Sequence, residues 1–411
     1  MNDVLKSFSR EEILTRASKH IFSTGIDDSA HRLCLENMKY GLAKIHYIQN
    51  KLGLEPNATF VGAPDATITR NVRRWSYGFG YGGKLSWGDG SEKLVILDTM
   101  PNACGMFVGG ISHLPDTKDL LRRINHLLSE NEVIDGIDIE WDFAVSNHFI
   151  DIYEVRPSTS NQDLHHNYAF IIHGSTPELK GDNNTKFKFG LYEHKSSVLR
   201  DSIEIFDTPF GDIRILTEEA AQKYLEFYEF AASLSMKKRK LAADYLFEDY
   251  GEICNPIHQG LLNMNEIALG CHIIDNNSDN IIYPMALRAD LPAYLLEGTS
   301  NLHDEVIEYL GFEKRAGTFG VRDRLTNANI LPHGGGYDFP HLLRVNRVLE
   351  ESNNQRYFVT DMGTGHESEM VFTTPRELQF SYRGRQVLAR TLELGLGTVV
   401  ANLMPRIVLK V

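Results

Sequence analysis

The sequence lacks the features that mark membrane-embedded, exported or disulfide-stapled proteins. No stretch approaches the ~18 consecutive apolar residues that a membrane-spanning helix requires. The first residues, MNDVLKSFSREEIL, are too charged for a secretory signal. The four cysteines are scattered and include no C-x2-C pair, which argues against a zinc finger and favours reduced thiols. We therefore expect a cytoplasmic protein that makes no contact with a membrane.

Positive charge is also scarce. The chain has 42 Lys and Arg against 55 Asp and Glu, and its formal net charge is −13. A protein that grips nucleic acid with its whole surface needs the opposite sign, so that class is excluded, whereas a local basic groove is not. Three basic clusters are present, each of which is ordinarily a solvated helix face or loop: Arg70, Arg73 and Arg74; Lys237, Lys238, Arg239 and Lys240; and Lys314, Arg315, Arg322 and Arg324.

The chain is long enough, at 411 residues, to bury a large core without a stabilising disulfide or metal. Apolar residues recur every three to four positions in some stretches, and short β-type runs alternate with glycine-rich turns in others. Helices are expected at 10–54, 117–130, 216–250, just after 257 and near 301–311, and strands within 58–112, at 133–155 and at 168–173. Since no repeat or linker interrupts this order, it predicts an α+β fold in one domain, 1–411, with an N-terminal helical segment (1–55) and a helical arm (216–250).

One cysteine and four histidines stand beside small residues at the edges of strand-like runs: Cys104 in PNACGMFVGG, His148 in SNHFIDIYEV, His173 in YAFIIHGS, His258 in IHQGL and His333 in LPHGGGYDFP. A thiolate and imidazoles suit a borderline divalent ion such as zinc or manganese, and a carboxylate beside them would favour manganese. The chain has 16 histidines, and these five ligands are dispersed. Each one taken alone is therefore ordinarily structural.

The segments that contain these residues resemble, in the same order, motifs of the RtcB-type RNA ligase family. The resemblance runs from about residue 60 to 411 and includes PD at 64–65 with YGFGYGGKL, PNACGMFVGG, SNHFIDIYEV, IIHGSTPELKG, IHQGL, LPHGGGYDFP, TDMGTGHESEMV, SYRGRQVLAR and MPRIVLKV. The collinear order argues against chance. The chain is therefore identified as resembling a divergent paralogue of that family.

The resemblance implies a single large domain with mixed and antiparallel sheets around a central metal cleft. It implies two manganese ions bridged by Cys104, with His148 bound to one ion and His173 and His258 bound to the other. It also implies residues that bind the nucleotide or a phosphate: Asn147, Gly334, Gly335, Gly363, Arg385 and Lys410.

The activity implied by the resemblance is the joining of RNA ends with GTP, as in tRNA splicing and RNA repair. His333 would attack the α-phosphate of GTP and form a covalent histidine–GMP. GMP would then pass to an RNA 3′-phosphate, which derives in some substrates from a 2′,3′-cyclic phosphate, and the 5′-hydroxyl of a second RNA would displace it. A neutral imidazole is a competent nucleophile for this chemistry, and metal ions offset phosphate charge and align the reacting oxygens.

The metal-binding segments depart from the family's pattern at two places. Pro101 stands where the family has its first metal-binding aspartate, three residues before the cysteine. Asp98, three residues further back, is the acidic residue left to replace it, provided that the loop is rearranged. Residues 176–178, Thr-Pro-Glu, stand where the family has Ser-Arg-Gly.

The guanylylation segments depart as well. Gly334, Gly335 and Asp338 replace charged residues that would stabilise a transition state at the triphosphate, and Tyr382 replaces a histidine. Two alternatives to end joining therefore stay open. One is a metal-dependent phosphoesterase or nucleotidyl-transfer enzyme, and the other is a non-catalytic protein that binds RNA ends.

Overall fold

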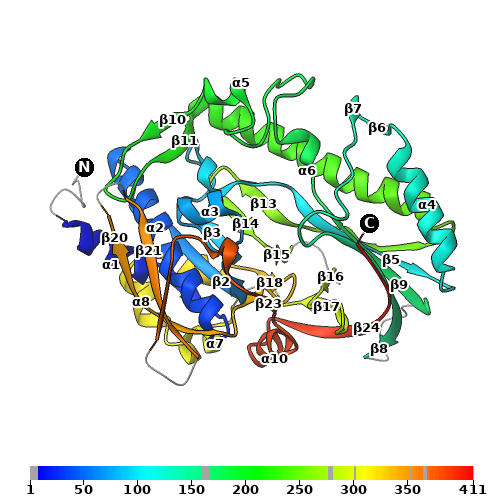
Figure 1. The fold of residues 1–411 in the computed structure, drawn as a ribbon. Coiled ribbons are helices and arrows are strands. Elements are labelled where there is room, and N and C mark those ends of the chain that lie inside the picture. The colour runs from blue at the N-terminus through cyan, green and yellow to red at the C-terminus, as the bar shows by residue number, and fades with distance from the viewer. Residues whose placement is uncertain are drawn as a thin grey trace.

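The computed structural model describes residues 8–158, 166–275, 281–299, 302–351, 354–363 and 368–410. A large curved sheet occupies its centre, with helices packed on it (Figure 1). The sheet includes β1 (Ile21–Ser23) from the start of the chain and β24 (Gly397–Leu409) from its end. One sheet therefore ties the described chain into a single unit, and the expected α+β class is confirmed.

Twelve strands of the described chain form this main sheet. Their hydrogen-bonded order is β1, β2 (Thr59–Thr67), β3 (Tyr81–Ser86), β14 (Glu266–Leu269), β13 (Ile257–Asn263), β5 (Cys104–Ile111), β9 (Tyr168–Gly174), β8 (Phe149–Pro157), β24, β17 (Ala293–Gly298) and β16 (Ile282–Met285), and β12 (Gly251–Cys254) also pairs with β5. The β1–β2 pair is parallel and the remaining pairs are antiparallel. The sheet is therefore mixed, as expected.

Smaller sheets flank the main one. Within the described ranges they are β10 (Glu204–Phe206), β11 (Ile213–Thr217) and β4 (Leu94–Ile96); β20 (Leu342–Glu350), β21 (Arg356–Met362) and β22 (Glu369–Phe372); and the pairs β15 (Cys271–Ile273) with β18 (Ile330–Pro332), β19 (Tyr337–Asp338) with β23 (Ser381–Tyr382) and β6 (Val133–Ile134) with β7 (Ile137–Asp138). The β19–β23 pair is important below because only three glycines separate β19 from His333.

The α-helices are α1 (Arg10–Lys19), α2 (Ser29–Lys51), α3 (Val72–Tyr77), α4 (Thr117–Ser129), α5 (Ser197–Arg200), α6 (Glu218–Leu246), α7 (Asp304–Tyr309), α8 (Glu313–Thr318), α9 (Arg322–Thr326) and α10 (Gln386–Glu393). Local chemistry explains where the N-terminal helices begin. Ser9 and Glu12 form a reciprocal capping box on α1, and Asp28 accepts the His31 amide at the start of α2. The N-terminal helical segment is thus two helices, separated by β1.

The long helix α6 lies within the segment expected as a helical arm, but it does not project as one. It runs along the sheet in Figure 1 and contacts β5, β9 and β13. Twelve of its side chains are buried, including Lys238 and Arg239. The arm interpretation is therefore wrong, since α6 is a covering layer whose buried cations reach toward the strands.

The helix expected just after 257 is also absent, because that segment is the β13–β14 hairpin. Apolar residues at 261, 264 and 268 fit a helical period, but the chain reverses at 264–265 and pairs with itself. No helix in the described part of the chain has the length and apolar character needed to cross a bilayer.

Candidate metal centre

Strand register brings the candidate ligands to one end of four neighbouring strands. In the β5–β9 ladder Gly105 faces Gly174, and in the β8–β9 ladder Phe149 faces His173. Cys104 at the start of β5, His148 just before β8 and His173 near the end of β9 are therefore neighbours in space. On the other side of β5, Gln259 of β13 pairs with Cys104, and a register shift at His258 turns that residue out of the regular ladder.

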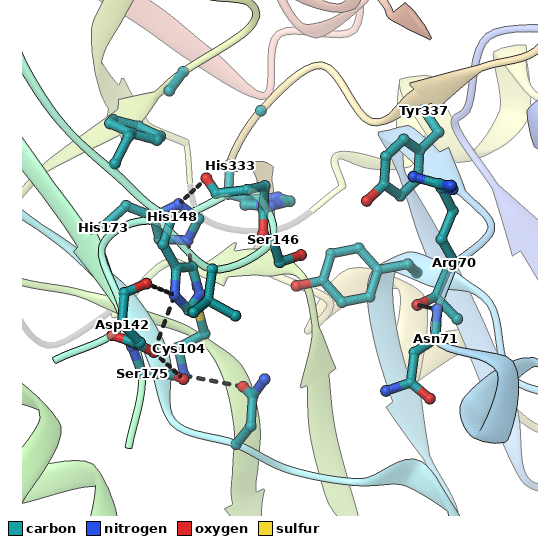
Figure 2. A pocket seen from close by; sticks show the side chains of 18 of the residues that line it. Arg70, Asn71, Cys104, Asp142, Ser146, His148, His173, Ser175, His333 and Tyr337 are labelled. Atoms are coloured by element: carbon teal, nitrogen blue, oxygen red, sulfur yellow. Dashed lines mark hydrogen bonds and ion pairs between the residues drawn. The ribbon is translucent and has the colours of Figure 1, made fainter. Parts of the chain in front are cut away.

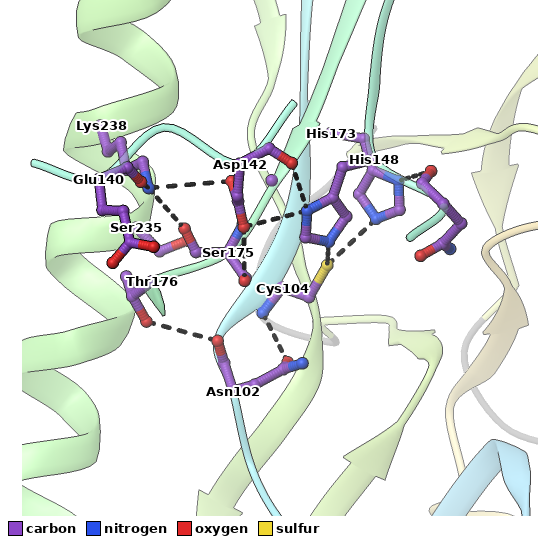
Figure 3. Close-up of polar contacts among 12 residues, drawn as sticks. Asn102, Cys104, Glu140, Asp142, His148, His173, Ser175, Thr176, Ser235 and Lys238 are labelled. Carbon is purple, nitrogen blue, oxygen red and sulfur yellow. Dashed lines mark hydrogen bonds and ion pairs between the residues drawn. The ribbon is translucent and has the colours of Figure 1, made fainter. Parts of the chain in front are cut away.

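The side chains converge as this register requires. The Cys104 Sγ lies 3.1 Å from His173 Nε2 and 3.3 Å from His148 Nε2 (Figure 3). One ligand atom each from Cys104, His173 and His258 lie within 4.8 Å of one another. Metal–ligand bonds of about 2.0–2.3 Å would allow one ion to bind all three. The structure therefore brings together the four cysteine and histidine ligands expected from the sequence.

His258 provides the test of whether the group fits a metal. Its side chain is fully buried, and neither ring nitrogen has a hydrogen-bond partner in the described structure. An orphaned buried polar atom costs about 1–3 kcal/mol, so a buried imidazole ordinarily finds a partner. Burial also holds the pKa values of His258 and His173 well below the usual histidine range. Both rings are thus neutral, which is the form that binds a metal.

Behind His148 lies a buried carboxylate that the sequence did not single out. Asp142 Oδ2 is 3.0 Å from His148 Nδ1, and the backbone carbonyl of Asp142 is 3.2 Å from the same nitrogen. The Ser175 amide and hydroxyl donate to this carboxylate at 3.1 and 2.8 Å. Burial raises the Asp142 pKa, but these contacts and Lys238 outweigh it and bring the pKa to about 2. Asp142 therefore remains ionised behind His148.

Two residues of the basic cluster at 237–240 extend from α6 and form hydrogen bonds with the segment that contains Ser175. Lys238 is 2% exposed and donates to the Ser175 carbonyl at 3.0 Å (Figure 3). It also donates to Glu178 at 3.2 Å. Arg239 is equally buried and donates to the Gly174 carbonyl at 3.2 Å. This pair therefore anchors the end of β9 and is not part of a solvated basic face.

His333 lies in the same region. Its ring centroid is 4.5 Å from that of His258, and its Nδ1 lies 2.9 Å from Asp65 Oδ2. When Nδ1–H donates a hydrogen bond to this carboxylate, the lone pair of the neutral ring is on Nε2, which is the nitrogen left for chemistry. Asp65 is 1% exposed. The sequence indicated it only through the Pro-Asp pair at 64–65, and no role was expected for its carboxylate.

The three glycines after His333 are required by close backbone packing. A Cβ would lie 2.7 Å from the Ala286 carbonyl oxygen at Gly334 and 2.5 Å from that of Arg383 at Gly335, and Gly336 has a φ of +69°. Side chains are therefore excluded from this turn, whatever it binds. Charge at this turn must come from other segments.

Cys104, His148, His173 and His333 line a cavity of about 1140 Å³. Figure 2 shows the cysteine–histidine cluster on one side and Arg70, Asn71 and Tyr337 across from it. Eight Lys and Arg line the cavity against three Asp and Glu: Arg70, Arg73, Arg74, Lys180, Lys195, Arg288, Arg376 and Lys410 against Glu140, Asp142 and Asp151. On a chain with a net charge of −13, this local excess of positive charge favours an anionic ligand.

The nucleotide-binding residues expected from the sequence divide into two groups. Asn147, Gly334, Gly335 and Lys410 line the cavity. The Asn147 backbone carbonyl accepts from His173 Nδ1 at 3.1 Å, and the Lys410 ammonium donates to the His148 carbonyl at 2.6 Å. Both residues therefore also orient the histidine cluster.

Arg385 and Gly363 do not belong to the cavity lining. Arg385 is exposed before α10, whereas Arg383 of the same SYRGR segment is fully buried, pairs with Asp28 and donates to the Asp65 carbonyl at 3.1 Å. Gly363 follows β21, where its amide donates to the His341 carbonyl at 3.0 Å. The structure thus places both of these expected nucleotide contacts outside the cavity lining.

Asp98 is the third correction. It is fully buried, and its oxygens contact Lys44 at 3.4 Å and Arg214 at 3.1 Å. Met100 and Ala103 adopt positive φ angles of 53° and 54°, so the chain turns sharply between Asp98 and Cys104. Asp98 does not join the cluster, since it belongs to an ion-pair network with α2 and β11.

The comparison with protein-family models and with curated protein sequences finds no match for this chain.

Proposed function

We propose that this chain is a GTP-dependent RNA ligase that joins a 3′-phosphate, or a 2′,3′-cyclic phosphate, to a 5′-hydroxyl through a covalent histidine–GMP on His333. The observation that supports this most directly is the His333–Asp65 contact in the wall of a basic cavity, beside three buried metal-ligand candidates. A nucleophilic imidazole, positive charge for phosphates and a metal site are the three parts that nucleotidyl transfer requires.

The chain's own residues account for the first step. Asp65 holds His333 so that the Nε2 lone pair attacks the α-phosphate, a phosphoramidate bond forms, and pyrophosphate leaves. The GMP then moves to an RNA 3′-phosphate, His333 is regenerated, and the 5′-hydroxyl displaces GMP as the phosphodiester forms. Cations of the cavity, including Lys410 and Arg288, hold the anionic reactants in place.

A divalent ion bound by Cys104, His173 and His258 would supply charge compensation for the phosphates. Asn147 and Lys410 orient the cluster through backbone contacts with His173 and His148. The neutral His173 and His258 rings are ready to bind without first losing a proton.

The test is covalent labelling. Purified chain supplied with a divalent metal is mixed with GTP labelled at the α-phosphate, and the protein-bound label is measured after denaturation. We expect an acid-labile, base-stable adduct in the wild type and in His113→Ala, which removes an exposed surface histidine, but not in His333→Ala. Label retained by a folded His333→Ala variant would remove His333 from this role.

A second function is favoured by a separate observation. The turn after His333 excludes side chains, so the positive charges that the resemblance implies there are missing. A metal-dependent phosphoesterase needs the Cys104–His173–His258 group but not His333. It would show metal-dependent turnover of a phosphodiester or cyclic phosphate that is retained in His333→Ala.

A further inference from the structure

The donor atoms at the centre are sulfur and nitrogen. Among the described residues, Cys104, His173 and His258 form the group of three or more candidate ligands, and no Asp or Glu belongs to it. Thiolate and imidazole donors favour zinc, whereas carboxylate, carbonyl and water oxygens favour manganese or magnesium. The composition of the group therefore points away from the manganese that the family resemblance implies.

Asp98 and Asp142, which lie near Cys104 and His148 in the chain, both make contacts outside the three-ligand group. Asp98 contacts Lys44 and Arg214, and Pro101 has no side-chain donor. Asp142 lies behind His148, and its carboxylate contacts the His148 ring, Ser175 and Lys238. Neither carboxylate belongs to the three-ligand group, so these two residues add no oxygen donor to it.

His148 contacts the Cys104 sulfur directly. Its Nε2 is 3.3 Å from Cys104 Sγ, yet it falls outside the three-ligand group. Its other nitrogen is held twice by Asp142, through the carboxylate at 3.0 Å and the backbone carbonyl at 3.2 Å. These contacts hold the His148 ring against the Cys104 sulfur. Residues that orient metal ligands are held by hydrogen bonds in the same way.

We propose that this chain binds one ion of the zinc class through Cys104, His173 and His258, and that the His148–Asp142 pair positions the Cys104 sulfur in place of a second ion. Three protein ligands leave one position open, as in catalytic zinc sites. This inference rests on the proposed function only in assuming that the centre binds metal.

The experiment counts ions. Metal-free chain is dialysed against equal concentrations of zinc(II) and manganese(II), and bound metal is measured per folded chain by elemental analysis, with folding checked by circular dichroism. We expect one zinc per chain and almost no manganese. Cobalt(II) substituted at the site is expected to show a thiolate charge-transfer band that Cys104→Ala abolishes.

Four variants separate ligands from positioning residues. His258→Ala is expected to lose the ion, and His272→Ala, a matched neighbour that is equally buried but hydrogen-bonded to the Pro284 carbonyl, is expected to keep it. His148→Ala and Asp142→Asn are expected to keep one ion and the charge-transfer band while zinc affinity falls about 10- to 100-fold. The use of both variants guards against one that does not fold.

Two ions per chain, preferred binding of manganese, or loss of the ion from folded His148→Ala would each overturn the inference. These outcomes are independent of guanylate labelling. A chain that holds one zinc but forms no adduct contradicts the proposed ligase and leaves this inference intact, whereas a labelled chain with two manganese ions does the reverse.

Discussion

Asp98 and Asp142 are both buried carboxylates that contact a lysine, but their surroundings differ. Around Asp98, burial outweighs the attraction of Lys44 and Arg214, so its pKa is raised, and burial lowers the Lys44 pKa to about 8. Around Asp142, contacts with His148, Lys238 and Ser175 outweigh burial, and its pKa falls to about 2. Contact with a lysine therefore does not by itself determine whether the pKa of a buried carboxylate is raised or lowered.

Buried histidines also differ between the N-terminal helices and the candidate metal centre. His20 and His46 pack edge to face near α1 and α2, with ring centroids 4.7 Å apart, and each has one nitrogen hydrogen-bonded within the protein. His258 has neither nitrogen bonded. His20 and His46 are therefore each held by one hydrogen bond, whereas the His258 ring has none.

The largest expected effect comes from Asp98→Ala. This change leaves Lys44 buried without a counter-charge, and breaking a buried ion pair in this way costs about 3–5 kcal/mol. We expect urea unfolding to show that loss while zinc bound per folded chain stays unchanged. A folded Asp98→Ala chain that loses its metal would make Asp98 part of the centre after all and erase the contrast with Asp142.

The next prediction concerns how His20 and His46 make the stability of the fold depend on pH. Burial lowers the pKa of His20 to about 2 and of His46 to about 3, so between pH 6.5 and these values the unfolded chain binds protons that the folded chain does not. Stability therefore falls as the pH falls below 6.5. The two groups together contribute a loss of about 2 kcal/mol between pH 6.5 and 5.5.

The matched variant for this titration is His46→Gln, measured by urea unfolding at both pH values. It removes one of the two titrating rings and is expected to reduce the pH-dependent loss by about 1 kcal/mol. Metal-centre histidines contribute equally to both chains, so they cancel in the difference. Identical pH dependence in the two chains would show that His46 is not held neutral by its packing.

The sequence was informative about the centre because its motifs follow the same order as those of the family that it resembles. Cys104, His148, His173 and His258 are far apart in the chain, and strand register, which a single sequence does not reveal, brings them together. Asp142 was missed because Asp138 and Glu140 lie in the same acidic stretch. Only the loop geometry selects the carboxylate that faces His148.

Local backbone conformation explains the expectations that were wrong. The position of Asp98 relative to Cys104 suggested a ligand, but left-handed residues at 100 and 103 redirect the chain. SYRGR offers two arginines, and β23 pairing with β19 buries Arg383 and leaves Arg385 exposed. Turns and edge pairings of this kind depend on tertiary contacts, so residue pattern alone does not fix them.

The last comparison is between two cations near the C-terminus, Lys410 and Arg385. Lys410 lines the cavity next to His148, whereas Arg385 is exposed outside it. Lys410→Ala is expected to raise the GTP dissociation constant about tenfold, or about 1.4 kcal/mol, measured by calorimetric titration. Arg385→Ala is expected to leave it unchanged, because an exposed charge outside the cavity is screened by solvent and salt. Equal weakening in both variants would mean that GTP binds partly outside the cavity and would assign to Arg385 the nucleotide contact that its exposed position argues against.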